Sequence, residues 1–214
     1  MKVGILSESA ADETGIHILC ESVLGEPLER LSPIQIRSRG WSAVFSYLPV
    51  AFKALHWRPD ADGLIVVVDS DETPIHTIQH EADGFSDSEC RYCKLQQMLA
   101  KLRRDTSPRA GAPLRVAVGI AVPAIEAWYQ CGVDIHCTEA RFGRETPANL
   151  QNLRRALKRE CYGAIQVPQR VMLDKAKEHG DRLRGSVVVL EQHFPSGFGA
   201  LARSLRAWTE SPKI

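Results

Sequence analysis

No stretch of this 214-residue sequence comes near the roughly 18 consecutive apolar residues that a membrane-spanning helix requires. The apolar run near its start, residues 3–6, is also too short for a signal peptide, and no small-residue cleavage site follows it. The sequence therefore predicts a cytoplasmic protein with no membrane association. Its six cysteines are then expected to be reduced, so we interpret them as core residues or metal ligands rather than as disulfides.

Two signatures of phosphate binding and hydrolysis are missing. The sequence contains no Gly-x-x-x-x-Gly-Lys-Ser/Thr segment, which excludes the phosphate-binding loop of P-loop ATPases. It has no Gly-x-Ser-x-Gly segment either, so serine hydrolase chemistry lacks support. Repeats and low-complexity tracts are also absent, and no linker is long enough to separate two independent domains.

Net charge is only +1, so the chain as a whole has no basic signature for nucleic acid. The charges are unevenly distributed, however. Residues 141–214 hold 14 Lys and Arg against 7 Asp and Glu, whereas residues 1–140 hold 13 against 19. An acidic half joined to a basic half suits an anionic polymer as substrate, although a solvated helix face explains the basic half equally well.

Apolar patterning predicts that strands and helices alternate along the first 130 residues. The predicted strands are residues 3–6, 33–37, 64–68 and 114–122, and the predicted helices are residues 12–24, 47–57, 93–102 and 125–129. The run 64–68 is five consecutive branched apolar residues, which is typical of a strand buried on both faces of a parallel sheet. We therefore expect an α/β fold with a mostly parallel, Rossmann-like sheet and helices on both faces.

Beyond residue 140 the pattern changes to a basic, α-rich extension, residues 141–214, that we expect to pack on the 1–140 core. The elements predicted here are helices at residues 147–160 and 199–208 and a short strand at residues 187–190. The first of these helices carries Arg154, Arg155, Lys158 and Arg159. Such a helix either binds phosphates or is simply solvated.

Acidic residues follow two of the predicted strands: Glu8 follows the first, and Asp69 and Asp71 follow the central one. In a parallel α/β sheet, ligands bind outside the carboxyl ends of the strands. Hard divalent ions such as Mg²⁺ prefer oxygen ligands, and bound Mg²⁺ stabilises the charge that develops on a phosphoryl oxygen. We therefore predict that Glu8, Asp69 and Asp71 bind Mg²⁺ or Mn²⁺. The alternative is that these acids only form soluble turns.

A phosphatase is the second interpretation of the same segment. Residues 69–73, Asp-Ser-Asp-Glu-Thr, fit the Asp-x-Asp-x-Thr pattern of haloacid-dehalogenase-type phosphatases, in which the first Asp is the nucleophile. Those enzymes also need a downstream lysine, for which Lys175 is the candidate. They need a late acidic pair as well, and residues 190–193, Leu-Glu-Gln-His, do not supply one.

Four further residues have the number and local spacing of a structural Zn²⁺ site. His76 and His80 form His-x₃-His, and Cys90 and Cys93 form Cys-x₂-Cys nine residues later. The polar segment between them has little core of its own, so zinc would fold residues 72–93 as an insert beside the acidic site. The alternative is that Cys93 packs as a small apolar residue and that the histidines lie on the surface or contact a substrate phosphate.

The acidic motifs resemble those of a TOPRIM-type metal-binding domain, which carries a Glu after its first strand and an Asp-x-Asp after a later one. More narrowly, the chain resembles a group of uncharacterised bacterial TOPRIM-like proteins. The motifs that carry this resemblance are Glu8 with Glu13, the segment Pro123-Ala-Ile-Glu-Ala-Trp128, and the segment Pro195-Ser-Gly-Phe198. The chain departs from the pattern at Ser9, where a glycine usually follows the first Glu.

The resemblance implies that Glu8 is a general acid/base or metal ligand and that Asp69 and Asp71 bind Mg²⁺. Glu126 would be an added acid at a neighbouring strand end. The reaction implied is phosphodiester cleavage in DNA or RNA, with an ATPase partner in antiviral defence or repair and with pairing into a homodimer. A non-catalytic interaction subunit that kept the TOPRIM fold is a further alternative, and Ser9 is its best support.

Overall fold

Four parallel strands form one sheet in the computed structural model, which describes residues 1–31 and 40–210. The strands, in the order β2-β1-β3-β4, are β2 (Glu29–Arg30), β1 (Lys2–Leu6), β3 (Gly63–Asp69) and β4 (Arg115–Ala121). This arrangement confirms the predicted α/β fold. The strand predicted at residues 33–37 lies outside the described residues, and the two-residue edge strand β2 has too short a pattern to be predicted.

The strand register brings three carboxyl ends to one edge of the sheet. β1 pairs with β3 from Val3 opposite Gly63 onward, and β3 pairs with β4 as far as Asp69 opposite Ala121. Residues 64–68 of β3 are each at most 2% exposed, because this central strand is covered on both faces. The residues that follow β1, β3 and β4 therefore meet at a common edge, which we call the carboxyl edge.

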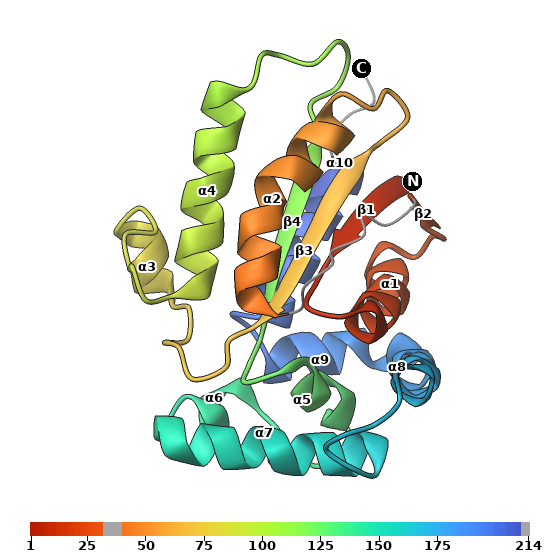
Figure 1. Ribbon diagram of the computed structural model, residues 1–214, viewed down its shortest axis with the longest axis vertical. Helices are drawn as coiled ribbons and strands as arrows, with labels where there is room; N and C mark the ends of the chain where they lie inside the picture. The colour runs from red at the N-terminus through yellow and green to blue at the C-terminus, as the bar shows by residue number, and fades with distance from the viewer. Residues whose placement is uncertain (32–39, 211–214) are drawn as a thin grey trace.

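Helices cover both faces of the sheet (Figure 1). Helices α2 (Trp41–His56) and α4 (Arg91–Asp105) pack on one face, and α1 (Ala10–Leu24) and α10 (Phe198–Glu210) pack on the other. Because α10 contacts β4, the last part of the predicted C-terminal extension is built into the main core. Within the described ranges, no helix combines the length and apolar character needed to cross a membrane.

A further group of helices closes the carboxyl edge (Figure 1). Its members are α5 (Ile125–Gln130), α6 (Glu139–Phe142), α7 (Pro147–Tyr162), α8 (Gln169–Leu183), the 3₁₀ turn η1 (Arg184–Ser186) and α9 (Val187–His193). The small helix α3 (Ile78–Ala82) lies beside α4, away from this group. α7 packs against α5 and runs across the end of the molecule, so the basic helix of the extension faces the strand ends.

The strand predicted at residues 187–190 is wrong, because this segment is the first turn of α9. Three consecutive valines favour a strand through their branched β-carbons. Only Leu190 is fully buried, whereas Val188 is 61% exposed and Val189 is 40% exposed. One buried position per turn matches the helical period, and a strand at this place would have no neighbouring strand with which to pair.

The segments 123–128 and 195–198 pack against each other. The fully buried Trp128 contacts Phe198 at the start of α10, with ring centroids 5.2 Å apart. Between them, a β-carbon at Gly197 would lie 2.1 Å from a carbonyl oxygen of β4, so only glycine fits. The carboxylate of Glu139 accepts hydrogen bonds from the backbone N–H groups of Ser196 (2.9 Å) and Gly197 (3.3 Å). These two segments therefore anchor α10 to the sheet.

Candidate active site and metal centre

Five carboxylates gather at the carboxyl edge, and we call them the acidic centre: Glu8, Asp12, Asp69, Asp71 and Glu126. Each comes from a segment that follows a parallel strand. Glu8 follows β1 and Asp12 lies in the first turn of α1; Asp69 is the last residue of β3 and Asp71 lies in the turn after it; Glu126 lies in the first turn of α5, after β4. The structure thus brings together all four acidic residues that the sequence predicts for the site, and it adds Asp12.

Backbone groups hold these carboxylates in place. The N–H of Asp69 donates to Glu8 Oε1 (3.0 Å), and Asp69 Oδ1 accepts from the N–H of Ile125 (3.0 Å). Asp71 has a left-handed backbone with φ of 52°, which aspartate tolerates, and its N–H donates to the carbonyl of Pro123 (3.0 Å). Asp69 is therefore tied to the segments on both sides of β3, which makes it the centre of the cluster.

Burial and mutual repulsion make the ionised state of this cluster costly. Burial raises the pKa of Asp69 well above its usual value, and repulsion from Glu8 and Glu126 adds to the rise. Burial and repulsion from Glu126 raise the pKa of Asp12 from an ordinary 3.8 to about 7. Burial also raises the pKa of Glu8 and of Glu126. Strongly shifted groups clustered at strand ends are typical of a functional site.

Two arginines from distant parts of the chain compensate this charge. Arg91 at the start of α4 donates to the carbonyl of Asp69 (2.6 Å) and to Asp71 Oδ2 (2.5 Å). Arg154 on α7 pairs with Asp71 Oδ1 and lies 3.9 Å from Asp69 Oδ2. One turn further along α7, Lys158 opposes the rise in the pKa of Glu126 that burial causes. The basic helix therefore turns one side toward the acidic centre, which the sequence does not establish.

The acidic centre is arranged as a network of ion pairs. Across residues 1–31 and 40–210, its carboxylates do not form a group in which three or more ligand atoms are close enough to share an ion. Glu126 Oε2 and the hydroxyl of Tyr162 are both buried without a hydrogen bond of good geometry, and the hydroxyl is close enough to oppose the rise in the pKa of Glu126. A buried carboxylate oxygen without a partner is costly, and it is a free site for a cation or a donor.

Asp12 is the acidic residue that sequence reasoning misses, and Ser9 explains its position. Ser9 is the N-cap of α1 and accepts a hydrogen bond from the N–H of Asp12 (3.2 Å). This cap sets the first turn of α1 so that Asp12 faces Glu126 and Glu8. Glu13, the second Glu of the predicted motif, instead pairs with Arg30 in β2. The backbone of Ser9 is extended, so no glycine is needed after Glu8.

A second cluster lies beside the first, and we call it the His/Cys centre: His76, His80, Cys90 and Cys93. One ligand atom from each residue lies within 4.8 Å of all the others, and in the described ranges no other such group of His, Cys, Asp or Glu occurs. His76 Nδ1 is 3.9 Å from both sulfur atoms. His76 is only 3% exposed, which contradicts the alternative of a surface histidine.

The outer nitrogen of each histidine faces a carboxylate. His76 Nε2 lies 3.2 Å from Glu81 Oε1, and His80 Nε2 lies 3.2 Å from Asp87 Oδ2. The other nitrogen of His80, Nδ1, is buried and has no hydrogen-bond partner. Carboxylates in this position orient imidazoles that bind a metal through their inner nitrogen.

The lysine required by the phosphatase interpretation does not lie in the acidic centre. Lys175 is on α8, where its Nζ donates to Glu178 Oε2 (2.7 Å). The lysine that acts on the acidic centre is Lys158.

Comparisons of the chain with family models, with curated proteins and with solved structures give no match.

Proposed function

We propose that the protein is a divalent-metal-dependent phosphodiesterase that cleaves DNA or RNA at the acidic centre. The observation that carries this proposal is the burial of Glu8, Asp69 and Glu126 together at three adjacent strand ends, where repulsion and desolvation raise their pKa values. Oxygen-only ligand sets of this kind suit Mg²⁺ or Mn²⁺. The strand-end position is where parallel α/β sheets bind their ligands.

The residue types suit a hard cation, but their oxygens are not close enough to share one, so Glu8, Asp69 and Glu126 would have to move together to hold it. Glu126 Oε2, which is buried, and Asp69 Oδ2, which lies 3.9 Å from Arg154, would supply ligand atoms. Bound Mg²⁺ supplies positive charge that stabilises the phosphoryl oxygens during cleavage. Arg154 would then move from Asp71 to a substrate phosphate, for which its planar guanidinium is suited. As a ligand of the cation Glu8 would be ionised, so the raised pKa of Glu8 in the metal-free site means that the cation would have to displace a proton from it.

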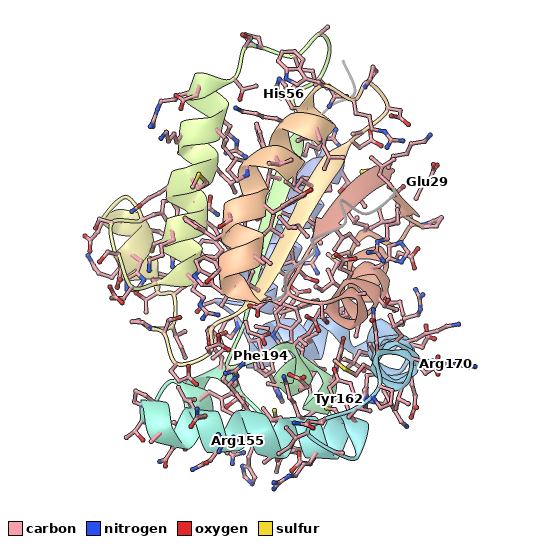
Figure 2. All side chains as sticks on the ribbon, in the orientation of Figure 1. Glu29, His56, Arg155, Tyr162, Arg170 and Phe194 are labelled. Carbon is pink, nitrogen blue, oxygen red and sulfur yellow. The ribbon has the colours of Figure 1, made fainter. Side chains whose placement is uncertain are left out.

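Exposed arginines on the outer side of α7 favour a polymeric substrate over a small one. Arg155 and Arg159 are exposed there, next to the two cations that face the acidic centre, and Figure 2 labels Arg155 on this helix. Cations on both sides of one helix can bind successive phosphates of a nucleic acid backbone. The structure places Lys175, the lysine expected for a phosphatase, on α8 in a pair with Glu178 instead.

Cleavage of a mixed DNA and RNA panel with Mg²⁺ or Mn²⁺ tests the reaction. We expect metal-dependent cutting that falls by at least about 100-fold in Asp69→Asn and in Glu126→Gln, because both remove charge from the centre. The matched controls are Asp105→Asn at the exposed end of α4 and Glu160→Gln on the exposed side of α7, which should cut like the wild type. Cutting that survives both site variants would place the reaction elsewhere in the chain.

Binding to labelled nucleic acid tests the role of α7. The double change Arg155→Ala with Arg159→Ala should weaken binding equally for all sequences and reduce the slope of log affinity against log salt by about 2. Fluorescence anisotropy at several salt concentrations measures both effects. The charge-matched control is Arg103→Ala with Arg104→Ala at the far end of α4. An equal loss in the control pair would show that only overall charge matters.

A non-catalytic subunit is the second candidate, and one observation favours it. Arg91 and Arg154 already pair with Asp71, so the chain itself neutralises part of the acidic centre. A folded protein that binds nucleic acid but cuts nothing, alone or with a partner ATPase, would support this candidate. In either case we place the protein in the cytoplasm, where its six free cysteines stay reduced. The homodimer that the family resemblance implies stays a prediction.

A further inference from the structure

We infer that the His/Cys centre binds one structural Zn²⁺ and that this ion positions Arg91 in the acidic centre. Zinc bonds of about 2.3 Å to sulfur and about 2.0 Å to nitrogen separate tetrahedral ligand atoms by roughly 3.5–3.8 Å. The observed 3.9 Å from His76 Nδ1 to the sulfur atoms of Cys90 and Cys93 is close to that spacing. All four ligand atoms lie within 4.8 Å of one another, so the most widely spaced of them must move inward by up to about 1 Å to bind the ion.

The protonation chemistry of the four ligands suits a buried ion. On binding, the thiols of Cys90 and Cys93 lose their protons to solvent while both imidazoles stay neutral. Two thiolates then balance the charge of Zn²⁺, so the buried site is neutral overall. The orphaned Nδ1 of His80 gains a partner, and Glu81 and Asp87 keep their bonds to the outer nitrogens.

Apart from the ring contacts of His76 and Phe85 with Tyr92, the segment that carries the histidines has little core of its own. No residue of α3 is buried, and its one large apolar side chain, Ile78, is 84% exposed. Short helices of this kind are unstable in isolation. The ion would link His80 of α3 to the two cysteines at the start of α4, which gives this polar segment the cross-link that its small core cannot supply.

Arg91 connects the two centres because it lies between the cysteine ligands. Cys90 is the N-cap of α4 and Cys93 is in its first turn, so an ion on both sulfurs fixes the backbone on either side of Arg91. The guanidinium of Arg91 contacts Asp69 and Asp71 and lies 5.1 Å from the ring of Trp41. The link between the zinc ion and the position of Arg91 is inferred from these contacts alone. Any effect of zinc on cleavage rests on the proposed function.

Metal analysis of the purified protein tests the site itself. We expect about one zinc per chain, and we expect Co²⁺ substitution to give the strong sulfur-to-metal absorption of a site with two thiolates. Glu81→Gln should weaken zinc binding by about 10–100-fold, and His80→Ala should weaken it further. His80→Cys keeps four ligands and should retain the ion, as should the exposed control His136→Ala. Absence of zinc from the folded wild type would overturn the site.

Tryptophan fluorescence tests the coupling without any need for cleavage. Removal of zinc by a chelator should change the emission of the wild type, because Arg91 moves relative to Trp41. The change should disappear in Trp41→Phe and in Arg91→Ala. A zinc-loaded protein whose Trp41 emission stays the same after the ion is removed would overturn the coupling. Neither result depends on nuclease activity, so failure here is distinguishable from failure of the proposed reaction.

Discussion

Asp12→Asn should make the protein more stable above pH 7 in the absence of Mg²⁺ and Mn²⁺, by on the order of 2 kcal/mol. The folded pKa of Asp12 is about 7, whereas its ordinary value is 3.8. Between these values the folded state binds more protons than the unfolded state. The contribution of Asp12 to the free energy of unfolding therefore falls as pH rises from about 4 to 7, and the loss of stability is complete above pH 7. Asparagine cannot ionise, so the variant avoids this loss.

Urea unfolding at pH 5 and at pH 8 measures the effect. The variant should differ from the wild type mainly at pH 8, where Asp12 is otherwise charged beside Glu126 and Glu8. Asp105→Asn, an exposed aspartate at the end of α4, controls for the change in net charge and should show no such difference. A variant that is less stable than the wild type at both pH values would mean that Asp12 stabilises the fold as an ion. Its repulsion by the cluster would then be unimportant.

The carboxylates of the acidic centre that lie next to the end of a strand could be predicted from the sequence. The apolar run 64–68 identifies β3, and Glu8 and Asp69 follow strands directly, so a parallel sheet brings them together. Glu126 is next to the end of β4 for the same reason. Asp12 was not predictable from strand ends, because it enters through the first turn of α1. The sequence Ser9-x-x-Asp12 is a helix-start pattern that could have indicated this placement.

The cations of the site depend on long-range packing that no local pattern encodes. Arg91 follows β3 by 22 residues, and Arg154 reaches Asp71 only because α7 crosses the carboxyl edge. A basic helix has the same composition whether it faces solvent or a buried carboxylate. At residues 187–190 a local pattern predicts the wrong element. Valine prefers strands, but this segment has no strand with which to pair and is helical. By contrast, the spacing of His76, His80, Cys90 and Cys93 is local, and the structure brings all four together.

Arg154→Met should destabilise the protein strongly without Mg²⁺, by about 2–3 kcal/mol, and more at pH 8 than at pH 5. Arg154 is partly buried, and it pairs with Asp71 and lies near Asp69, so its loss leaves negative charge with less compensation. Arg154 also opposes the rise in the pKa of Asp69. The variant should therefore raise this pKa further, and a raised carboxyl pKa costs stability as pH increases. Arg155→Met, one residue along on the exposed side of α7, is the matched control.

Addition of Mg²⁺ to the Arg154→Met protein then separates the two candidate functions. A phosphodiesterase centre should bind the cation in place of the guanidinium, so the free energy of unfolding should recover as Mg²⁺ is added. The recovery should be larger at pH 8, because protons compete with the metal for Glu8, Asp69 and Glu126 at lower pH. An ion-pair network without a metal site should show no such recovery. Stability that stays low at saturating Mg²⁺ would therefore favour the non-catalytic subunit, because the cation would then be unable to replace the charge of Arg154.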